Sequence, residues 1–333
     1  MTFTANGEYI VGGGDGLGVW RVEDGKQIAT MAAWGVWCIA ASQDGRWVAA
    51  GTAWGEVSVW DAKTFKNVFT HKEYHPDVLG VDFSPDSTRF VTASKNQTAT
   101  VWDVATRKKV LTIPHNGCVT AAKYSPQGDR IATATPDSVR LYDSNGERLL
   151  EIPVKVTPLC NTGLLWSNNH LFVVSDGKIK QLEPSTGSAV SEWQAHDTND
   201  SSCIALPKHE EFIAYSTNDT TAFWDMLTHA RLGLIQHTQS TRSIAFSPDD
   251  RILAIAGHGG RITITSLSRI TVSIVFLWIN ANLNNFLVLV VFPTRIQSQC
   301  LVYIPLSRNL TFRSTMLRLI HGSTINSRMR RRC

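Results

Sequence analysis

An internal repeat of about 40 residues is the feature that most limits how this chain can fold. Short strand-like runs end on a large residue at regular distances, as in "VSVWDA" and "ATVWDV". Neighbouring positions of this series lie 40, 42, 40, 40, 42 and 41 residues apart. The seven positions are Trp20, Trp60, Trp102, Tyr142, Leu182, Trp224 and Thr265. A period of this length indicates several copies of one small structural unit packed together.

Each copy has the pattern of four short strands. In the third copy these are "VLGVDFS", "RFVTAS", "ATVWDV" and "KKVLTIP", and turns such as "SQDG", "SPDS" and "SPQG" separate the first two strands of a copy. Such turns favour Asp, Gly and Pro for conformational reasons. A four-stranded sheet of this size cannot bury both of its faces alone, whereas sheets packed around an axis can. The sequence therefore predicts an all-β, seven-bladed β-propeller of four-stranded antiparallel blades.

One further pattern fits the innermost strand of each blade, where seven strands crowd around the axis. The same early position of the first strand holds small residues in five copies, namely Cys38, Gly80, Ala121, Cys203 and Ser243. The chain starts at "MTFTANG", which matches only the end of a first strand. Blade one is therefore expected to be incomplete, as in a chain truncated at its N-terminus.

Charge and cysteine content bound the environment and the partners. All 28 acidic residues lie at or before Asp250 beside 21 Lys and Arg, which gives 21 − 28 = −7, while residues 251–333 hold 11 Arg and no acid. The basicity is confined to the tail, so the propeller itself is not expected to bind nucleic acid. The six cysteines show no metal-ligand spacing, and the first residues lack a signal-peptide pattern. A cytoplasmic or nuclear location is expected.

The period, the "SPD" turns and the "VWD" strand ends resemble the WD-repeat β-propellers over roughly residues 3–268. In that family the tryptophan forms a hydrogen-bonded set with a Ser or Thr on the second strand, a His before the first strand and an Asp in the turn between strands two and three. The resemblance gives the hydroxyl role to Thr52, Ser94 and Ser216. It gives the histidine role to His75, His115, His196 and His237.

The aspartate of this set is where the chain departs from the family. The corresponding positions read Gly14, Trp54, Asn96, Pro136, Asp176, Asn218 and Gly259. No blade has a complete set, and blades three and six come closest. Their candidate structural residues are His75, Ser94, Trp102, His196, Ser216 and Trp224, to which Trp20 and Trp60 are added from blades one and two. Asparagine is a weaker hydrogen-bond acceptor than a carboxylate, so a propeller of modest stability is expected.

Motifs of catalysis are missing from the sequence. It contains no GxxxxGK[ST] and no HExxH, and "GGGDGLG" at 12–18 leads into a strand and not into a phosphate-binding helix. The repeated histidines fall one to a blade, which separates them around the ring and argues against a metal site. No enzymatic activity, cofactor or metal is predicted.

Aromatic residues on one rim are the candidate functional residues. In WD-repeat propellers the loops between strands two and three and between blades share a rim that recognises proteins. Trp34, Trp54 and Tyr74 fall in such loops, whereas Trp37 is expected to point into the core between blades. Exposed aromatic residues are enriched in binding hot spots. The predicted function is a non-catalytic scaffold for other proteins, whose identity the sequence does not give; a small-ligand or enzymatic propeller is an alternative.

The last quarter of the chain falls into two further segments. Residues 269–293 are apolar, and residues 270–294 carry no charge, which is long enough for a membrane span that would tether the propeller. Four asparagines in this segment and its β-branched start favour the outer strand of blade seven or a hairpin. Residues 294–333 form a basic tail, expected to be disordered or non-native, with an Arg-rich segment that binds nucleic acid or anionic lipid as the alternative.

Overall fold

The computed structural model describes residues 1–13, 16–72, 76–156, 163–196, 203–237, 240–257, 261–267, 275–281, 284–291 and 300–305. The chain divides into two compact units, Met1–Leu267 and Ser268–Cys333. Within the described residues all regular elements of the first unit are strands, apart from one 3₁₀ position at Leu267. No described helix is long and apolar enough to span a membrane.

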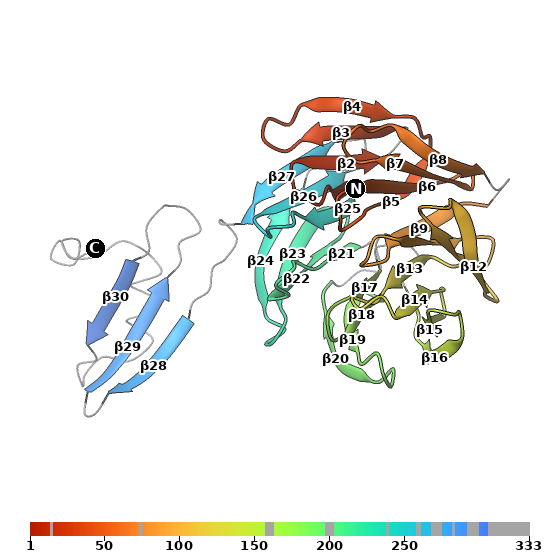
Figure 1. Cartoon of the computed structure of the whole chain (residues 1–333). Coiled ribbons are helices and arrows are strands. Elements are labelled where there is room, and N and C mark those ends of the chain that lie inside the picture. Colours follow the sequence, from red (N-terminus) through yellow and green to blue (C-terminus); the bar gives the residue numbers. More distant parts are fainter. Residues whose placement is uncertain are drawn as a thin grey trace. The chain divides into compact units, whose positions relative to one another are not determined.

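The first unit consists of seven antiparallel sheets that follow one another along the chain (Figure 1). The first four blades are β1 (Thr2–Phe3), β2 (Tyr9–Gly13), β3 (Leu17–Arg21), β4 (Gln27–Met31); β5 (Val36–Ala41), β6 (Trp47–Thr52), β7 (Glu56–Asp61), β8 (Asn67–Lys72); β9 (Val78–Phe83), β10 (Arg89–Ser94), β11 (Thr98–Asp103), β12 (Lys108–Pro114); and β13 (Ala121–Tyr124), β14 (Arg130–Ala134), β15 (Ser138–Asp143), β16 (Arg148–Pro153). The other three are β17 (Leu164–Trp166), β18 (Leu171–Ser175), β19 (Lys178–Leu182), β20 (Ala189–Gln194); β21 (Cys203–Ala205), β22 (Phe212–Ser216), β23 (Thr220–Asp225), β24 (Arg231–Gln236); and β25 (Thr241–Phe246), β26 (Ile252–Gly257), β27 (Ile262–Ser266).

The first strand of each blade lies innermost and closes the ring. β5 contacts β9, β9 contacts β13, and the series continues through β17 and β21 to β25. β1 contacts both β25 and β5, so the ring has no open junction. This arrangement confirms the predicted seven-bladed propeller. The five small residues of the inner strands occupy one equivalent ladder position, where Cys38 pairs with Gly51 and Gly80 pairs with Ala93.

Blades one and seven are the two that differ from the others. β1 has only two residues, in agreement with the expectation that blade one lacks most of its first strand. Blade seven has three strands within the described residues. Of the run expected to form its fourth strand, residues 270–274 lie outside the described residues, and Val275 and Phe276 belong to β28 (Val275–Ala281).

The second unit contains a separate antiparallel sheet of β28, β29 (Asn284–Val291) and β30 (Cys300–Pro305). β28 and β29 are neighbours in the chain and pair from Val275 with Val290 to Ala281 with Asn284. β30 pairs with the other side of β29, from Cys300 with Val291 to Pro305 with Phe286. The Arg-rich segment expected near the end of the chain lies outside the described residues.

The turn between the first two strands explains the repeated Ser-Pro-Asp. In blade three the hydroxyl of Ser84 donates to Asp86 Oδ1 over 2.6 Å and accepts the backbone N–H of Arg89 over 3.0 Å. Ser42 with Asp44 and Ser247 with Asp249 form the same bond, also over 2.6 Å. One serine thus satisfies two groups of a tight turn, which is why these residue types recur at fixed spacing.

The aspartate of the Trp-Asp pair has a comparable role in the turn after the third strand. Asp61 Oδ1 accepts hydrogen bonds from the backbone N–H and the hydroxyl of Thr64, over 2.7 and 2.8 Å. These bonds hold the pKa of the Asp61 carboxyl below its ordinary value. Asp103 accepts the same two bonds from Thr106. The Trp-Asp dipeptide is therefore a structural element of the blade.

Trp102 is buried between blades two and three, and its hydrogen-bond partner differs from the predicted one. Its indole Nε1–H donates to the hydroxyl of Thr92 over 3.0 Å. Ser94 instead donates to the carbonyl of Asp77 over 2.9 Å and accepts the backbone N–H of Asn96. The prediction for Ser94 was wrong because both side chains lie on the same face of β10, and the one nearer the ladder partner of Trp102 is Thr92.

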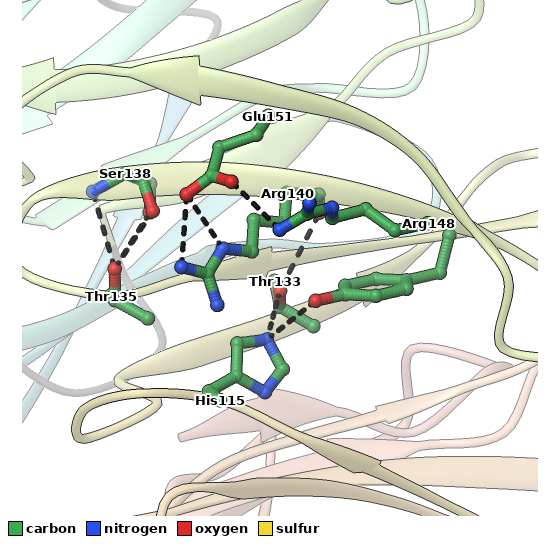
Figure 2. Close-up of polar contacts among 8 residues, drawn as sticks. His115, Thr133, Thr135, Ser138, Arg140, Arg148 and Glu151 are labelled. Atoms are coloured by element: carbon green, nitrogen blue, oxygen red, sulfur yellow. Dashed lines mark hydrogen bonds and ion pairs between the residues drawn. The ribbon is translucent and has the colours of Figure 1, made fainter.

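Within the described residues blade four forms such a set around His115 and Thr133 (Figure 2), with Tyr142 at the position of the tryptophan. His115 Nε2 lies 2.8 Å from Thr133 Oγ1 and 3.3 Å from the hydroxyl of Tyr142. His115 is buried, and this burial lowers its pKa to about 4. Thr133 occupies the ladder position of Thr92, since each lies two residues beyond the partner of the aromatic residue. Blade four, and not the predicted blade six, therefore shares this threonine position with blade three.

Blade six lacks the expected bonds. The buried Nε1–H of Trp224 has no hydrogen-bond partner within the described residues. Ser216 lies 2.8 Å from Thr221 Oγ1, which in turn lies 2.8 Å from His237 Nε2. The histidine predicted for blade seven therefore contacts blade six, and the hydroxyl of Ser216 does not reach Trp224. The predicted set in blade six was wrong on this point.

The other candidate structural residues lie as follows. His196 precedes β21, and its backbone N–H donates to the carbonyl of Gly177 over 2.9 Å. Trp60 is buried between blades one and two. Trp20 lies flat against Gly18, where a Cβ would come within 2.3 Å of its ring. Glycine at position 18 thus creates the space that the ring fills. His75 lies outside the described residues.

Candidate functional site

One rim of the propeller is formed by the turns between strands two and three together with the connections that enter the next blade. Consecutive antiparallel strands place these two kinds of loop at the same end of every blade. Backbone hydrogen bonds join them: Ala53 N–H to Gly35, Lys95 N–H to Asp77, Val156 N–H to Pro136, Ala195 N–H to Gly177 and Thr241 N–H to Asn218, with lengths of 2.8 to 3.0 Å. The loops of this rim are therefore held against one another by the backbone.

Trp34 and Trp54 lie on this rim and expose most of their surface. Trp34 is 71% exposed and Trp54 is 62% exposed. The bond from Ala53 N–H to the carbonyl of Gly35 holds their two loops together. Gly35 has a φ of 61°, and a Cβ at this position would lie 3.3 Å from Trp54 Nε1. The ring of Trp54 thus rests over Gly35, next to Trp34 in the chain.

Trp37 was expected in the core between blades, and this prediction was wrong. Its side chain is 45% exposed, and the register of β5 against β6 shifts between Val36 and Cys38, so that Trp37 is the bulged residue. A bulge re-aims the side chain of the extra residue. The sequence held one signal: Cys38 occupies the small inward position, and its neighbour in a strand points the other way. Trp34, Trp37 and Trp54 are called the rim tryptophans below.

Tyr74, the third predicted member of the patch, lies outside the described residues. Charged groups accompany the rim tryptophans on other blades. Asp77 and Lys95 form an ion pair of 2.5 Å at the entry to blade three. Asp137, Asp176 and Asp219 are exposed on the turns of blades four, five and six. This rim therefore combines an aromatic sector on blade two with these three exposed carboxylates, called the acidic sector below, which lie on the blades beyond blade three beside the exposed Lys155.

Groups with shifted pKa values lie together in two places in the described part of the chain. One is blade four, with His115, Tyr142 and Arg140, and the other is the inner strands, where burial lowers the pKa of the Met1 amine to about 6 beside Cys203. Burial lowers the pKa of His115 and raises the pKa of Cys203 to about 12, but His115 belongs to the hydrogen-bonded set of blade four and Cys203 to the inner strand of blade six. Among the described residues no three His, Cys, Asp or Glu side chains are grouped as metal ligands would be. Burial is the main cause of the shifts of the Met1 amine, His115 and Cys203.

Comparison with known proteins places the repeats in one family. The model of the WD domain, G-beta repeat, matches residues 25–61, 64–103, 107–143 and 231–266. WD repeat-containing protein 18 from Danio rerio is 25% identical over 276 residues, which cover 73% of this chain and 63% of that protein. Periodic tryptophan protein 2 from Arabidopsis thaliana is 24% identical over 230 residues, 66% of this chain and 25% of that protein. The chain thus spans between a quarter and just under two thirds of these relatives.

Two further comparisons agree with the match to the WD domain, G-beta repeat. The transcriptional corepressor LEUNIG_HOMOLOG from Arabidopsis thaliana is 21% identical over 276 residues, covering 68% of this chain and 34% of that protein. The solved structure of U3-55K matches 80% of this chain and 94% of its own with a TM-score of 0.69 at 16% identity, which is a likeness of fold. WD40 propellers are typically interaction scaffolds and usually non-catalytic. The register of the blades, the Ser-Asp turns and the family match together establish that this chain belongs to the WD40 repeat family.

Proposed function

We propose that this propeller is a non-catalytic scaffold that binds another protein through the rim tryptophans. The observation that carries the proposal is the pair Trp34 and Trp54, both more than half exposed on loops joined by the bond from Ala53 to Gly35. A monomeric protein gains no stability from leaving such rings in water. Large aromatic side chains on a fixed backbone bind with little loss of conformational freedom.

Two properties of the site support protein recognition in preference to a small ligand. Trp34 and Trp54 lie on loops and expose most of their surface, whereas small ligands are bound in concave sites that bury most of the ligand. The acidic sector of Asp137, Asp176 and Asp219 lies on the same rim and suits a partner with basic residues at a distance from its apolar anchor. A partner spanning several blades would use both sectors. Tyr74 is proposed as a further contact because it falls in the connection that enters blade three.

The test is a pull-down with the full chain and the double variant Trp34→Ala, Trp54→Ala. Loss of two hot-spot aromatics is expected to cost at least about 2 kcal/mol of binding, roughly a thirtyfold weaker complex. Leu227→Ala is the matched control, because Leu227 is an exposed apolar residue on a turn at the opposite rim. Proteins retained by wild type and by Leu227→Ala should be missing from the double variant. Equal retention by the double variant, at an unchanged unfolding midpoint, would reject the assignment.

A further inference from the structure

The turn between the third and fourth strands contains one residue with a positive φ in each of blades one to six. Glycine holds this position in three blades, as Gly25, Gly146 and Gly187. The other three blades have a residue with a side chain there, namely Phe65, Arg107 and His229, with φ values of 55°, 60° and 55°. A Cβ makes this left-handed conformation unfavourable, so a side chain at this position calls for a compensating interaction.

Phe65 and His229 have such an interaction with the preceding blade. The ring of Phe65 packs on Tyr9 of blade one, with 5.8 Å between the ring centres. The ring of His229 stacks on Trp193 of blade five, with 4.3 Å between the ring centres. The side chain of Arg107 is exposed and forms no hydrogen bond or ion pair within the described part of the chain. Its guanidinium thus stands on an unfavourable backbone without a polar contact that would explain it.

Basic residues surround Arg107 and continue onto blade two. The turn sequences 61–67 and 103–109 hold five basic residues against two acidic ones, 5 − 2 = +3. Four basic and six acidic residues, 4 − 6 = −2, occupy the equivalent stretches 21–27, 143–149, 183–189 and 225–231. In the adjoining turns between first and second strands Arg46 and Arg89 accompany Asp44 and Asp86, so these turns add no net charge. The positive charge therefore belongs to the third turns of blades two and three.

These two turns border the same junction between blades. β8 follows the turn of blade two directly, and its Phe69 packs against the same apolar cluster as Val104 of the blade-three turn. Lys109 Nζ lies 5.3 Å from the ring centre of Trp102, and the ring of His71 in β8 lies 4.8 Å from the same ring. The basic turn of blade three therefore lies against the strand that begins at the basic turn of blade two.

An exposed apolar residue lies next to these charges. Val110 is 48% exposed and is the bulged residue of β12, because the register against β11 shifts between Val101 and Trp102. A partner that suits this surface therefore carries carboxylates around an apolar residue. Nucleic acid suits it less, because the chain up to Asp250 carries a net charge of 21 − 28 = −7, which repels a long polyanion.

We propose that Lys63, Lys66, Arg107 and Lys108, called the basic junction, bind an acidic segment of a partner protein. The guanidinium of Arg107 donates paired hydrogen bonds to one carboxylate of that segment, and Val110 packs against an apolar residue beside it. The partner thus supplies the interaction that offsets the left-handed backbone of Arg107. The basic junction lies at the rim opposite the rim tryptophans, so failure of either proposal leaves the other intact.

The probe is a short peptide that alternates Asp-Glu pairs with single leucines, incubated with the full chain and a carbodiimide. This reagent joins a carboxylate to a lysine amine in contact with it, and mass spectrometry locates the crosslinked lysine. Residues 251–333 contain no lysine, so their arginines contribute no crosslinks. Lys26 is the matched internal control, because it has the position of Lys66 and Lys108 in the turn of blade one, whose charges balance.

Crosslinks at Lys66 and Lys108 are expected to exceed those at Lys26 at least about tenfold. Arg107→Gly should reduce the yield at Lys108 by about tenfold, since a charge-assisted contact of about 1.4 kcal/mol is a factor of ten. It should leave the unfolding midpoint unchanged or raise it, because glycine suits the left-handed φ. Undiminished crosslinking in this variant, equal crosslinking at Lys26 or a lower unfolding midpoint would overturn the proposal. So would loss of the crosslinks at an equal concentration of mixed-sequence DNA, which would assign the surface to nucleic acid.

Discussion

Replacing Thr92 by valine tests which hydroxyl partners the buried tryptophan of blade three. The substitution keeps the shape of the side chain and removes the acceptor 3.0 Å from Trp102 Nε1. Both residues are buried, so the indole N–H would lose its partner away from water. Leaving a buried donor unsatisfied costs about 1–3 kcal/mol. For a unit of this size each kcal/mol lowers the melting temperature by roughly 2–4 °C.

A double-mutant cycle separates this bond from other losses. In the Trp102→Phe background the indole donor is absent, and Thr92→Val should then cost only the weaker bond from Thr92 to the carbonyl of Thr100, 3.3 Å long. The coupling between the two substitutions is expected to be about 1 kcal/mol or more in urea unfolding. Ser94→Ala is the control, because Ser94 bonds to Asp77 and Asn96 and should cost the same in both backgrounds. Coupling of Ser94 but not of Thr92 with Trp102 would refute the reasoning.

Two further predictions concern blade four and the rim. Because the folded pKa of His115 is about 4 and its unfolded value is 6.5, the unfolded chain takes up the proton first as the pH falls. Stability is therefore full above pH 6.5 and declines toward pH 4; between pH 7 and 5 the free energy of unfolding should drop by about 2 kcal/mol. His115→Gln should flatten this part of a urea-unfolding series, and an equally steep decline in that variant would contradict the assignment. Gly35→Ala forces a left-handed φ of 61° on a residue with a side chain and places its Cβ against Trp54. It should destabilise the fold by about 1 kcal/mol and move the ring of Trp54, measured as a shift in tryptophan emission; unchanged emission would show that the ring does not rest on Gly35.

The fold could be predicted because its signal is repeated seven times. The strand alternation recurs along the chain, with the Ser-Asp turn in blades two, three and seven and the Trp-Asp strand end in blades two, three and six, so an irregular copy is corrected by the others. The pairing of Thr92 with Trp102 could not be read by counting residues. The distance in sequence between the two strands varies with turn length, whereas the hydrogen bond depends on the ladder register, which places Thr92 and Thr133 at one position.

The rim residues were predicted less completely, and for a different reason. Trp34 and Trp54 fall in loops, and a loop position is enough to predict exposure. The exposure of Trp37 depends on a bulge opposite Thr52 and Gly51, and the register shifts at the same place in blades three and seven. The bulged residue is buried in one of these blades, as Leu79, and exposed in the other, as Arg242, so the bulge alone does not predict exposure.

The distribution of tryptophan gives the propeller an optical reporter at its proposed binding rim. Trp34, Trp37 and Trp54 are in contact with water, whereas Trp60 and Trp102 are buried. Tyrosine at position 142 leaves blade four without a tryptophan between Trp102 and Trp166. Collisional quenchers such as acrylamide should therefore act first on the rim. A partner that covers this rim would protect it and shift its emission to shorter wavelengths, so the unlabelled protein can report binding by its own fluorescence.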